Sequence, residues 1–319
     1  MVSHTCFQYL EITFVRDKTT RMKPLFFIII IILTFFSSCK KDDETTDSTV
    51  EIGPRIIFKF AFDSTQERLN SLGNISTVPT GNGAQNPVFN KISAHYIELT
   101  PTMFTALGAG EIVYKAPETD AGGDTAIDFN QAIVVAEGQD FLAIPLSELT
   151  AGSYEFVRVS LAYQNYDIDF LAEGFELTGT LASFIGFNTY IQNYTINTQN
   201  IEVNDDRLQG YWAFETEVPF VGVQTYTGQA PPGATTVPNP LFASSPIPAG
   251  SCVVTGEFAE PLVIQGNETE DIIVTISLST NQSFEWTEVN VDGKFEPGAG
   301  ENVVDMGIRG LIPYVTIGE

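Results

Sequence analysis

The stretch that decides the fold class spans residues 154–163 and reads YEFVRVSLAY. Its apolar side chains at 157, 159, 161 and 163 alternate with Arg158 and Ser160, which is the period-two pattern of a strand with one buried face. Residues 272–278, IIVTISL, repeat this alternation, and three phenylalanines repeat it within residues 55–63. These stretches therefore predict strands that bury one face each.

The rest of the chain reads as short strands separated by turns. Further strands are predicted at residues 92–99, 111–115, 126–136, 141–144, 175–187, 190–203, 211–220, 253–258, 262–265 and 311–317. One short helix is predicted at residues 63–73, where Ser64 and Glu67 have the spacing of a capping box. The chain is therefore predicted to be all-β, an antiparallel β-sandwich with one or two short helices.

Two domain organisations are compatible with residues 229–250. This stretch contains six prolines and no strand pattern, so it is either a long loop of one β domain or a linker between two. We favour the loop, because residues 251–319 alone contain few predicted strands. A single β-sandwich domain is thus predicted over residues 55–319, with a subdivision near 229–250 as the alternative.

An export segment is predicted near the start of the chain. Met22-Lys23-Pro24 is followed over residues 25–36 by a run that is apolar except for one threonine. A membrane-spanning helix needs about 20 apolar residues, so this shorter run behind a basic residue is typical of a signal peptide. Residues 1–38 are assigned to the signal-peptide region, and because residues 1–21 are polar and mixed in charge, translation is expected to begin at Met22.

The end of this segment carries a resemblance to a known class. Phe36-Ser37-Ser38-Cys39 resembles a lipobox, and the charged run that follows, KKDDE, resembles the export signal of Bacteroidota-type outer-membrane lipoproteins. Phe36 stands where leucine is usual. The resemblance implies that Cys39 is lipidated, that residues 39–54 are a flexible tether, and that the protein is held on the outer membrane, at the cell surface. The periplasmic face remains the alternative.

The charge of the chain limits its partners. The formal net charge is −25, so phosphate backbones and anionic lipid headgroups would repel it. Nucleic-acid binding is therefore not expected, whereas cations are plausible small partners. The same charge also suits an exported protein that simply has to stay soluble.

The number of histidines excludes several kinds of enzyme site. After processing, His95 is the only histidine, so a histidine-based triad and a multi-histidine zinc site cannot be built. Cys252 is expected to be a small buried residue. An enzyme is thus not predicted, although a glycosidase that uses two carboxylates remains an alternative, since that chemistry needs no histidine.

One segment near the C-terminus resembles a calcium loop. Oxygen-bearing side chains recur at alternate positions before Gly293, in the order of the D-x-N-x-D-G pattern, and more acids follow. The candidate calcium ligands are Glu288, Asn290, Asp292, Glu296 and Glu301. The alternative is an ordinary hairpin turn, because Asp-Gly between strand-like runs is a strong turn pattern.

Tyr211, Trp212 and Trp286 could stack on sugars or pack in a core. The function expected from all these features is that of a lipid-anchored, non-catalytic cell-envelope protein that binds a glycan or a protein. A structural or accessory lipoprotein stabilised by calcium is the first alternative. The carboxylate-based glycosidase is the second.

Overall fold

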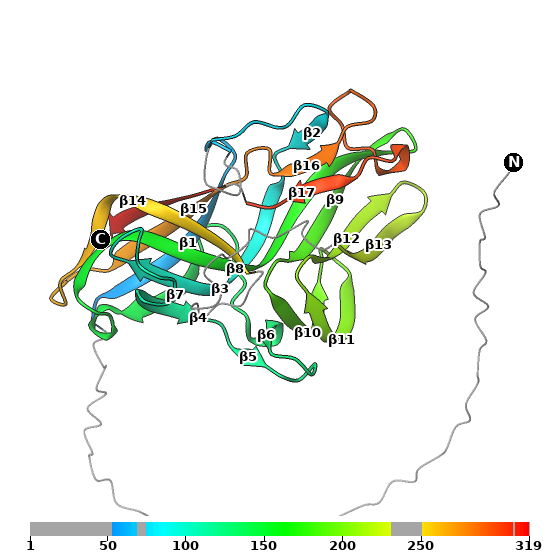
Figure 1. Ribbon diagram of the computed structural model, residues 1–319. Coiled ribbons are helices and arrows are strands. Elements are labelled where there is room, and N and C mark those ends of the chain that lie inside the picture. Colours follow the sequence, from blue (N-terminus) through cyan, green and yellow to red (C-terminus); the bar gives the residue numbers. More distant parts are fainter. Residues whose placement is uncertain (1–52, 69–74, 231–250, 309, 319) are drawn as a thin grey trace, which may run out of the picture. The chain divides into compact units, whose positions relative to one another are not determined.

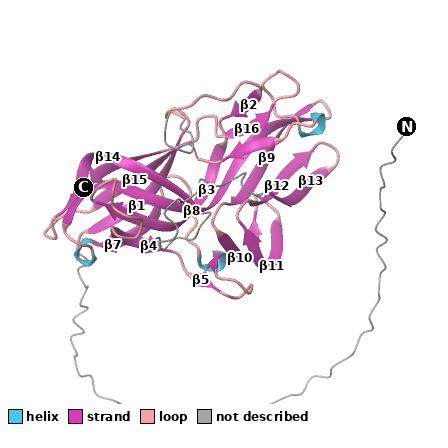
Figure 2. Cartoon of the chain, in the orientation of Figure 1, coloured by secondary structure: helices cyan, strands magenta, loops and turns pink. Residues whose placement is uncertain are grey.

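The computed structural model describes residues 53–68, 75–230, 251–308 and 310–318, and in these parts the chain is all-β, as predicted (Figures 1 and 2). The strands are β1 (Arg55–Asp63), β2 (Asn82–Gln85), β3 (Val88–Thr100), β4 (Glu111–Lys115), β5 (Glu118–Thr119), β6 (Ala126–Asp128), β7 (Asp140–Pro145), β8 (Gly152–Ala172), β9 (Phe175–Phe184), β10 (Asn188–Thr195), β11 (Asn200–Leu208), β12 (Tyr211–Val218), β13 (Gly222–Gln229), β14 (Cys252–Ile264), β15 (Ile272–Ser279), β16 (Phe284–Thr287), β17 (Val303–Met306) and β18 (Leu311–Ile317). The 3₁₀ turns are η1 (Phe129–Gln131), η2 (Leu146–Glu148) and η4 (Pro297–Ala299).

Strand β8 is the longest described strand and links the parts of the fold. It lies in a seven-stranded sheet of order β13-β12-β9-β8-β3-β4, with β14 paired to its first half. Its second half pairs with β9 from Tyr163 to Ala172. The stretch 154–163, whose alternation predicted a strand, is the part of β8 that β14 and β3 flank.

The largest core lies between this first half of β8 and a second sheet of order β18-β15-β1-β7. Phe58 and Phe60 of β1 pack there with Val157 and Val159 of β8, and all four are almost fully buried. Burial of each such side chain contributes roughly 1.5–3 kcal/mol relative to an exposed one. The apolar residues that alternate in the sequence are therefore the ones whose side chains point into this core.

The second half of β8 is covered on both faces, because successive residues of a strand point to opposite sides. Tyr163 packs on one face with Phe184 and the tyrosines of β10 and β12. Tyr166 packs on the other face with Phe284 and Trp286 of β16. Figure 1 shows β10 and β11 on one side of the β9–β12 region, and β2, β16 and β17 on the other.

Two strand pairs depart from the predicted antiparallel arrangement. β1 pairs with β15 in parallel, and β6 pairs with β10 in parallel. The strand predicted over residues 126–136 is also much shorter, because β6 ends at Asp128. There the Asp128 carboxylate accepts hydrogen bonds from the backbone N–H and side chain of Asn130 and starts the 3₁₀ turn η1.

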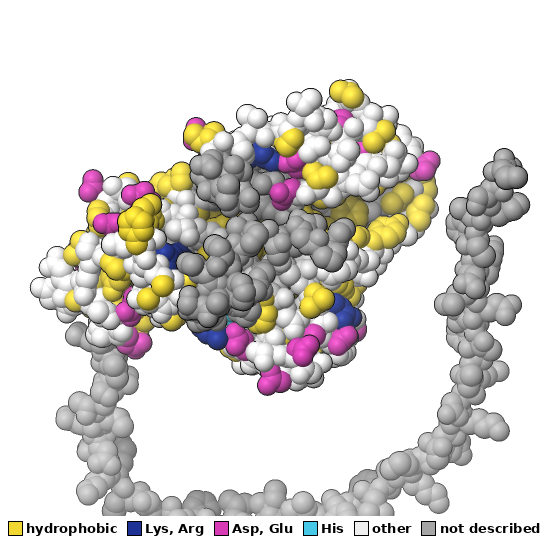
Figure 3. Space-filling view, in the orientation of Figure 1, with side chains coloured by type: hydrophobic (Ala, Val, Ile, Leu, Met, Phe, Trp, Pro, Cys, Tyr) yellow, Lys and Arg dark blue, Asp and Glu magenta, His cyan; other side chains and the backbone are white. Residues whose placement is uncertain are grey.

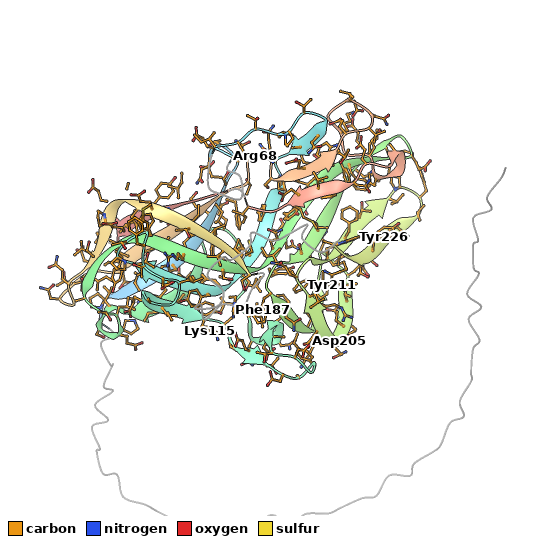
Figure 4. All side chains as sticks on the ribbon, viewed as in Figure 1. Arg68, Lys115, Phe187, Asp205, Tyr211 and Tyr226 are labelled. Atoms are coloured by element: carbon orange, nitrogen blue, oxygen red, sulfur yellow. The ribbon has the colours of Figure 1, made fainter. Side chains whose placement is uncertain are left out.

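The helix predicted at residues 63–73 is wrong over its described part, which ends at residue 68. Asp63 is the last residue of β1, and its Oδ1 accepts the backbone N–H and the hydroxyl of Thr65 at 2.7 and 2.6 Å. The predicted capping box would have used the backbone N–H groups of Ser64 and Glu67, whereas here the side chain of Asp63 closes a local turn through Thr65. Arg68 follows, buried, and donates to the Glu285 carboxylate of β16 (Figure 4).

The strands on either side of residues 231–250 belong to shared sheets. After that stretch, β14 pairs with β8, β15 with β1, and β16 with β2. The described strands all lie within one compact unit, residues 51–319. The predicted export segment, Cys39 and most of the tether lie outside the described residues. Among the described residues, no helix is long and apolar enough to cross a membrane.

Candidate functional site

A cavity of about 650 Å³ opens on the face of the seven-stranded sheet formed by the second half of β8 with β9, β12 and β13. Its opposite wall comes from β16, β17 and the segment between them. Aliphatic side chains line much of it, together with six aromatic ones: Phe170, Trp212, Phe214, Tyr226, Phe284 and Phe295. Figure 3 shows hydrophobic side chains gathered over the region of β12 and β13.

The alternation of β12 places Trp212 and Phe214 in this pocket and Tyr211 on the opposite face. Trp212, Phe214 and Thr216 line the cavity, whereas Ala213 between them is buried in the core on the other face of the sheet. Strand β13 continues the same surface with Tyr226, which pairs with Phe214 and is half exposed at the outer side of the pocket (Figure 4).

Two glycines let these rings lie against the sheet. A Cβ at Gly179 would lie 2.1 Å from Cζ of Phe214, and a Cβ at Gly228 would lie 2.4 Å from Cζ2 of Trp212. Any side chain at either position would push the ring away from the strand beneath it. The floor of the pocket is thus shaped by aromatic rings that cross over glycine backbone.

The polar groups of the lining are few. They include Thr216 and Gln229 on the sheet side, and Glu301, Asn302 and Asp305 on the opposite wall. The Thr216 hydroxyl donates to the Thr178 carbonyl at 3.0 Å, and Glu301 is buried. A predominantly apolar pocket of this size with a few polar groups is the usual form of a small-molecule site.

Glu301 organises the wall in which it stands. Its Oε1 accepts the backbone N–H groups of Val289 and Asn290 at 2.9 and 3.2 Å, and its Oε2 accepts that of Glu296 at 2.6 Å. Three backbone donors on one carboxylate fold residues 288–301 around it. Glu301 therefore fixes the position of Phe295, the aromatic residue that this segment contributes to the pocket.

The structure brings the predicted calcium ligands onto this one segment. Glu288 Oε1 accepts the backbone N–H of Gly293 at 2.7 Å, Asp292 Oδ1 accepts that of Lys294 at 2.9 Å, and the Asn290 amide donates to Glu296. Among the residues that the structure describes, no three acidic, histidine or cysteine side chains are grouped so that they could hold a metal ion. Gly293 has a φ of +75°, but the ordinary hairpin turn that was the alternative does not form there, because β16 ends at Thr287 and β17 begins only at Val303. Calcium binding remains a prediction, in which the ion would have to replace these backbone donors.

Two other residues considered for chemistry, His95 and Cys252, do not line the pocket. His95 is fully buried, with Nε2 3.0 Å from Glu118 Oε1 and its ring against Phe187. Burial lowers the pKa of His95, although Glu118 opposes the shift, so the ring is neutral near pH 7. Cys252, which was expected to be buried, is partly exposed as a residue, and burial of its thiol raises the pKa to about 12.

Sequence reasoning found only part of the pocket. Of the three aromatic residues considered for ligand stacking, Trp286 is fully buried and Tyr211 is buried in the opposite core, whereas Trp212 lines the cavity. Tyr226 was not considered, because its strand carries no apolar alternation. Comparison of the chain with models of protein families, with curated proteins and with solved structures finds no match.

Proposed function

We propose that this protein is a lipid-anchored, non-catalytic binding protein of the cell envelope, and that its ligand is a small amphipathic molecule whose apolar body fills the aromatic pocket. The observation that carries the proposal is the cavity of about 650 Å³ with six aromatic side chains in its lining. That volume falls within the range of about 300–1,000 Å³ that is usual for small-molecule sites. The lipid anchor at Cys39 is the part of the proposal that rests on the sequence alone.

The lining favours an apolar ligand over a glycan. A sugar stacks on aromatic rings but also brings many hydroxyl groups, each of which needs a hydrogen-bond partner once it leaves water. The pocket offers few such partners, and both oxygens of Glu301 already accept backbone N–H groups. For the same reason, Glu301 is a poor candidate for the acid or base of a glycosidase. A glycan ligand stays the second candidate, because Trp212 and Tyr226 offer aromatic rings on which a sugar could stack.

Filling the pocket tests the site. The protein from Lys40 onward would be titrated with N-phenyl-1-naphthylamine, a neutral apolar fluorophore, in the wild type and in Val218→Trp. Val218 lines the cavity, so the larger side chain should weaken binding of the fluorophore by about tenfold or more.

The matched control is Val223→Trp. Val223 is exposed on β13, does not line the pocket, and lies one position out of phase with Tyr226, so its side chain points to the other face. This variant should bind the fluorophore as the wild type does. Equal binding by the wild type and Val218→Trp would contradict the proposed site.

Competition then identifies the ligand class. Displacement of the fluorophore by medium-chain fatty acids or indole derivatives supports an amphipathic ligand, whereas displacement by oligosaccharides alone would replace it with a glycan. The anchor is tested separately, because Cys39→Ser should move the protein from the membrane fraction to the soluble fraction of its native host. Retention of that variant in the membrane would contradict lipidation at Cys39.

A further inference from the structure

Strand β13 is an open edge of the seven-stranded sheet. It pairs with β12 over eight consecutive residues without a bulge, and within the described part of the chain it has no second neighbour. Five of these eight residues are exposed, namely Val223, Thr225, Tyr226, Thr227 and Gln229, and the other three are partly exposed. An edge of this kind presents backbone donors and acceptors that another strand can use.

Its sequence, GVQTYTGQ, lacks the devices that usually protect an edge, since it has no charge and no proline. Each of the other described edge strands of five or more residues contains at least one charged residue or proline. β4 has Glu111 and Lys115, β7 has Asp140 and Pro145, β11 has three acids and Arg207, β14 has two acids and Pro261, and β18 has Pro313. Of these edges only β13 and β18 carry no charge, and β18 is interrupted by Pro313, so in a chain with a net charge of −25 β13 is the unbroken edge at which two copies can approach without like charges facing each other.

The hydrogen-bond pattern shows which backbone groups this edge offers. Ala230 N–H donates to the Gly210 carbonyl at 2.9 Å, and the hairpin closes between Val218 and Gly222, so the even-numbered residues of β13 bond to β12. The N–H and C=O groups of 223, 225, 227 and 229 then point outward. The Val223 carbonyl also accepts the side chain of Gln224 at 3.0 Å, a local contact that an incoming strand can displace.

We propose that β13 is a self-association edge, at which two copies of this protein pair antiparallel about a two-fold axis. An axis at Tyr226 is the arrangement that uses all four outward residues, because it sets Thr225 opposite Thr227 of the partner subunit and Val223 opposite Gln229 of the partner subunit. A two-fold pairing of this kind is the commonest symmetry of soluble oligomers. The half-exposed Tyr226 would meet its own counterpart on the pocket face, so the two pockets would lie side by side.

Charge placed on the edge tests the proposal. Thr225 and Thr227 are exposed and alternate with Tyr226, so their side chains point away from the pocket. A variant with Thr225→Lys and Thr227→Lys, and another with Thr225→Glu and Thr227→Glu, should each put like charges opposite each other in the pairing about Tyr226. Sedimentation velocity of the chain from Lys40 between about 1 and 200 μM would measure the mass, a range that covers interfaces of weak to moderate affinity.

The expected result has three parts. The wild type should shift from the monomer mass to twice that mass as its concentration rises, and each double variant should stay monomeric. An equimolar mixture of the lysine and glutamate variants should regain the doubled mass, because opposite charges then face each other. Binding of N-phenyl-1-naphthylamine should be unchanged in both variants, which separates this test from that of the pocket.

The matched control places the same charges on another open edge. Tyr314→Lys with Thr316→Lys alters two exposed residues of β18, and this variant should still associate. A wild type that stays monomeric to 200 μM would overturn the proposal. Association that persists in both β13 variants would overturn it as well, since the interface would then lie elsewhere.

Discussion

Glu98 of β3 and Arg158 of β8 form a buried ion pair, with Arg158 Nη1 3.7 Å from Glu98 Oε2. Both also bind the loop that follows β3. Glu98 Oε1 accepts the backbone N–H groups of Gly108 and Gly110 at 3.0 and 2.6 Å, and Arg158 Nη2 donates to the Thr105 carbonyl at 2.7 Å. The pair therefore holds residues 101–110 on the sheet.

Removing one partner of this pair should be costly. Arg158→Met leaves the Glu98 carboxylate buried without its cation, and breaking a buried pair in this way costs about 3–5 kcal/mol. The double variant with Glu98→Gln should recover at least about 1 kcal/mol of that loss, because the amide keeps an acceptor for the two glycine N–H groups but carries no charge. Urea denaturation of the two variants and the wild type measures this, and a double variant less stable than Arg158→Met would contradict the account.

A second carboxylate should make stability depend on pH. Burial of Glu215 would raise the pKa of this carboxyl, but the Thr198 hydroxyl and the backbone N–H groups of residues 197–199 outweigh it and hold the pKa below the usual 4.5. Because the folded-state pKa is depressed, the ionised form stabilises the fold above pH about 4.5, and this stabilisation is lost as the pH falls below that value.

Glu215→Gln tests this prediction. The variant should be less stable than the wild type at pH 7 by about 1–3 kcal/mol, because a charged acceptor of several N–H groups has become neutral. The difference should shrink as the pH is lowered from 5 toward 3. Melting curves across that range provide the measurement, and a constant difference at every pH would contradict the role given to Glu215.

The strands that the sequence predicted well are those whose own side chains form the core. Residues 154–163 and 272–278 alternate because one face of each packs in the largest core. β13 was missed for the opposite reason, since GVQTYTGQ has no apolar alternation and forms a strand because it pairs with β12. The parallel pairing of β1 with β15 joins segments more than 200 residues apart, and no local pattern encodes it.

The pocket could not be read from the sequence for a related reason. Phe170, Phe214 and Phe295 come from three separate elements that only the sheet pairing and the Glu301 wall bring together. The candidate calcium residues, by contrast, are local in sequence, so the motif could be proposed from the chain, although the described acidic side chains are not grouped as a metal site would require. Local motifs could thus be proposed from the chain alone, whereas a cavity assembled by long-range contacts could not.

Calcium should bind weakly to residues 288–301, the segment proposed from the sequence. The ion would have to replace backbone N–H groups at Glu288, Asp292 and Glu301, so affinity in the millimolar to submillimolar range of extracellular modules is expected. The melting temperature should then rise with about 1 mM calcium over chelator in the wild type, and this rise should vanish in Asp292→Asn. The control is Glu268→Gln, which changes a carboxylate that accepts N–H groups in a different loop and should keep the response. A wild-type melt unaffected by calcium would remove the site.

The turn between β12 and β13 contains a residue in an unfavourable conformation. Phe220 has a φ of +68° and is fully exposed, directly after Pro219, in the place where a turn of this shape prefers glycine or asparagine. A left-handed conformation costs a non-glycine residue roughly 1–2 kcal/mol, and the exposed ring gains nothing from burial. Phe220→Asn should therefore leave stability unchanged or raise it by up to about 1 kcal/mol, measured by urea denaturation.

The matched reverse change is Gly222→Ala, which puts a side chain at a φ of +93° and should destabilise by about 1 kcal/mol or more. A clear loss of stability in Phe220→Asn would contradict this prediction, because it would mean that the phenylalanine makes contacts that outweigh its strain.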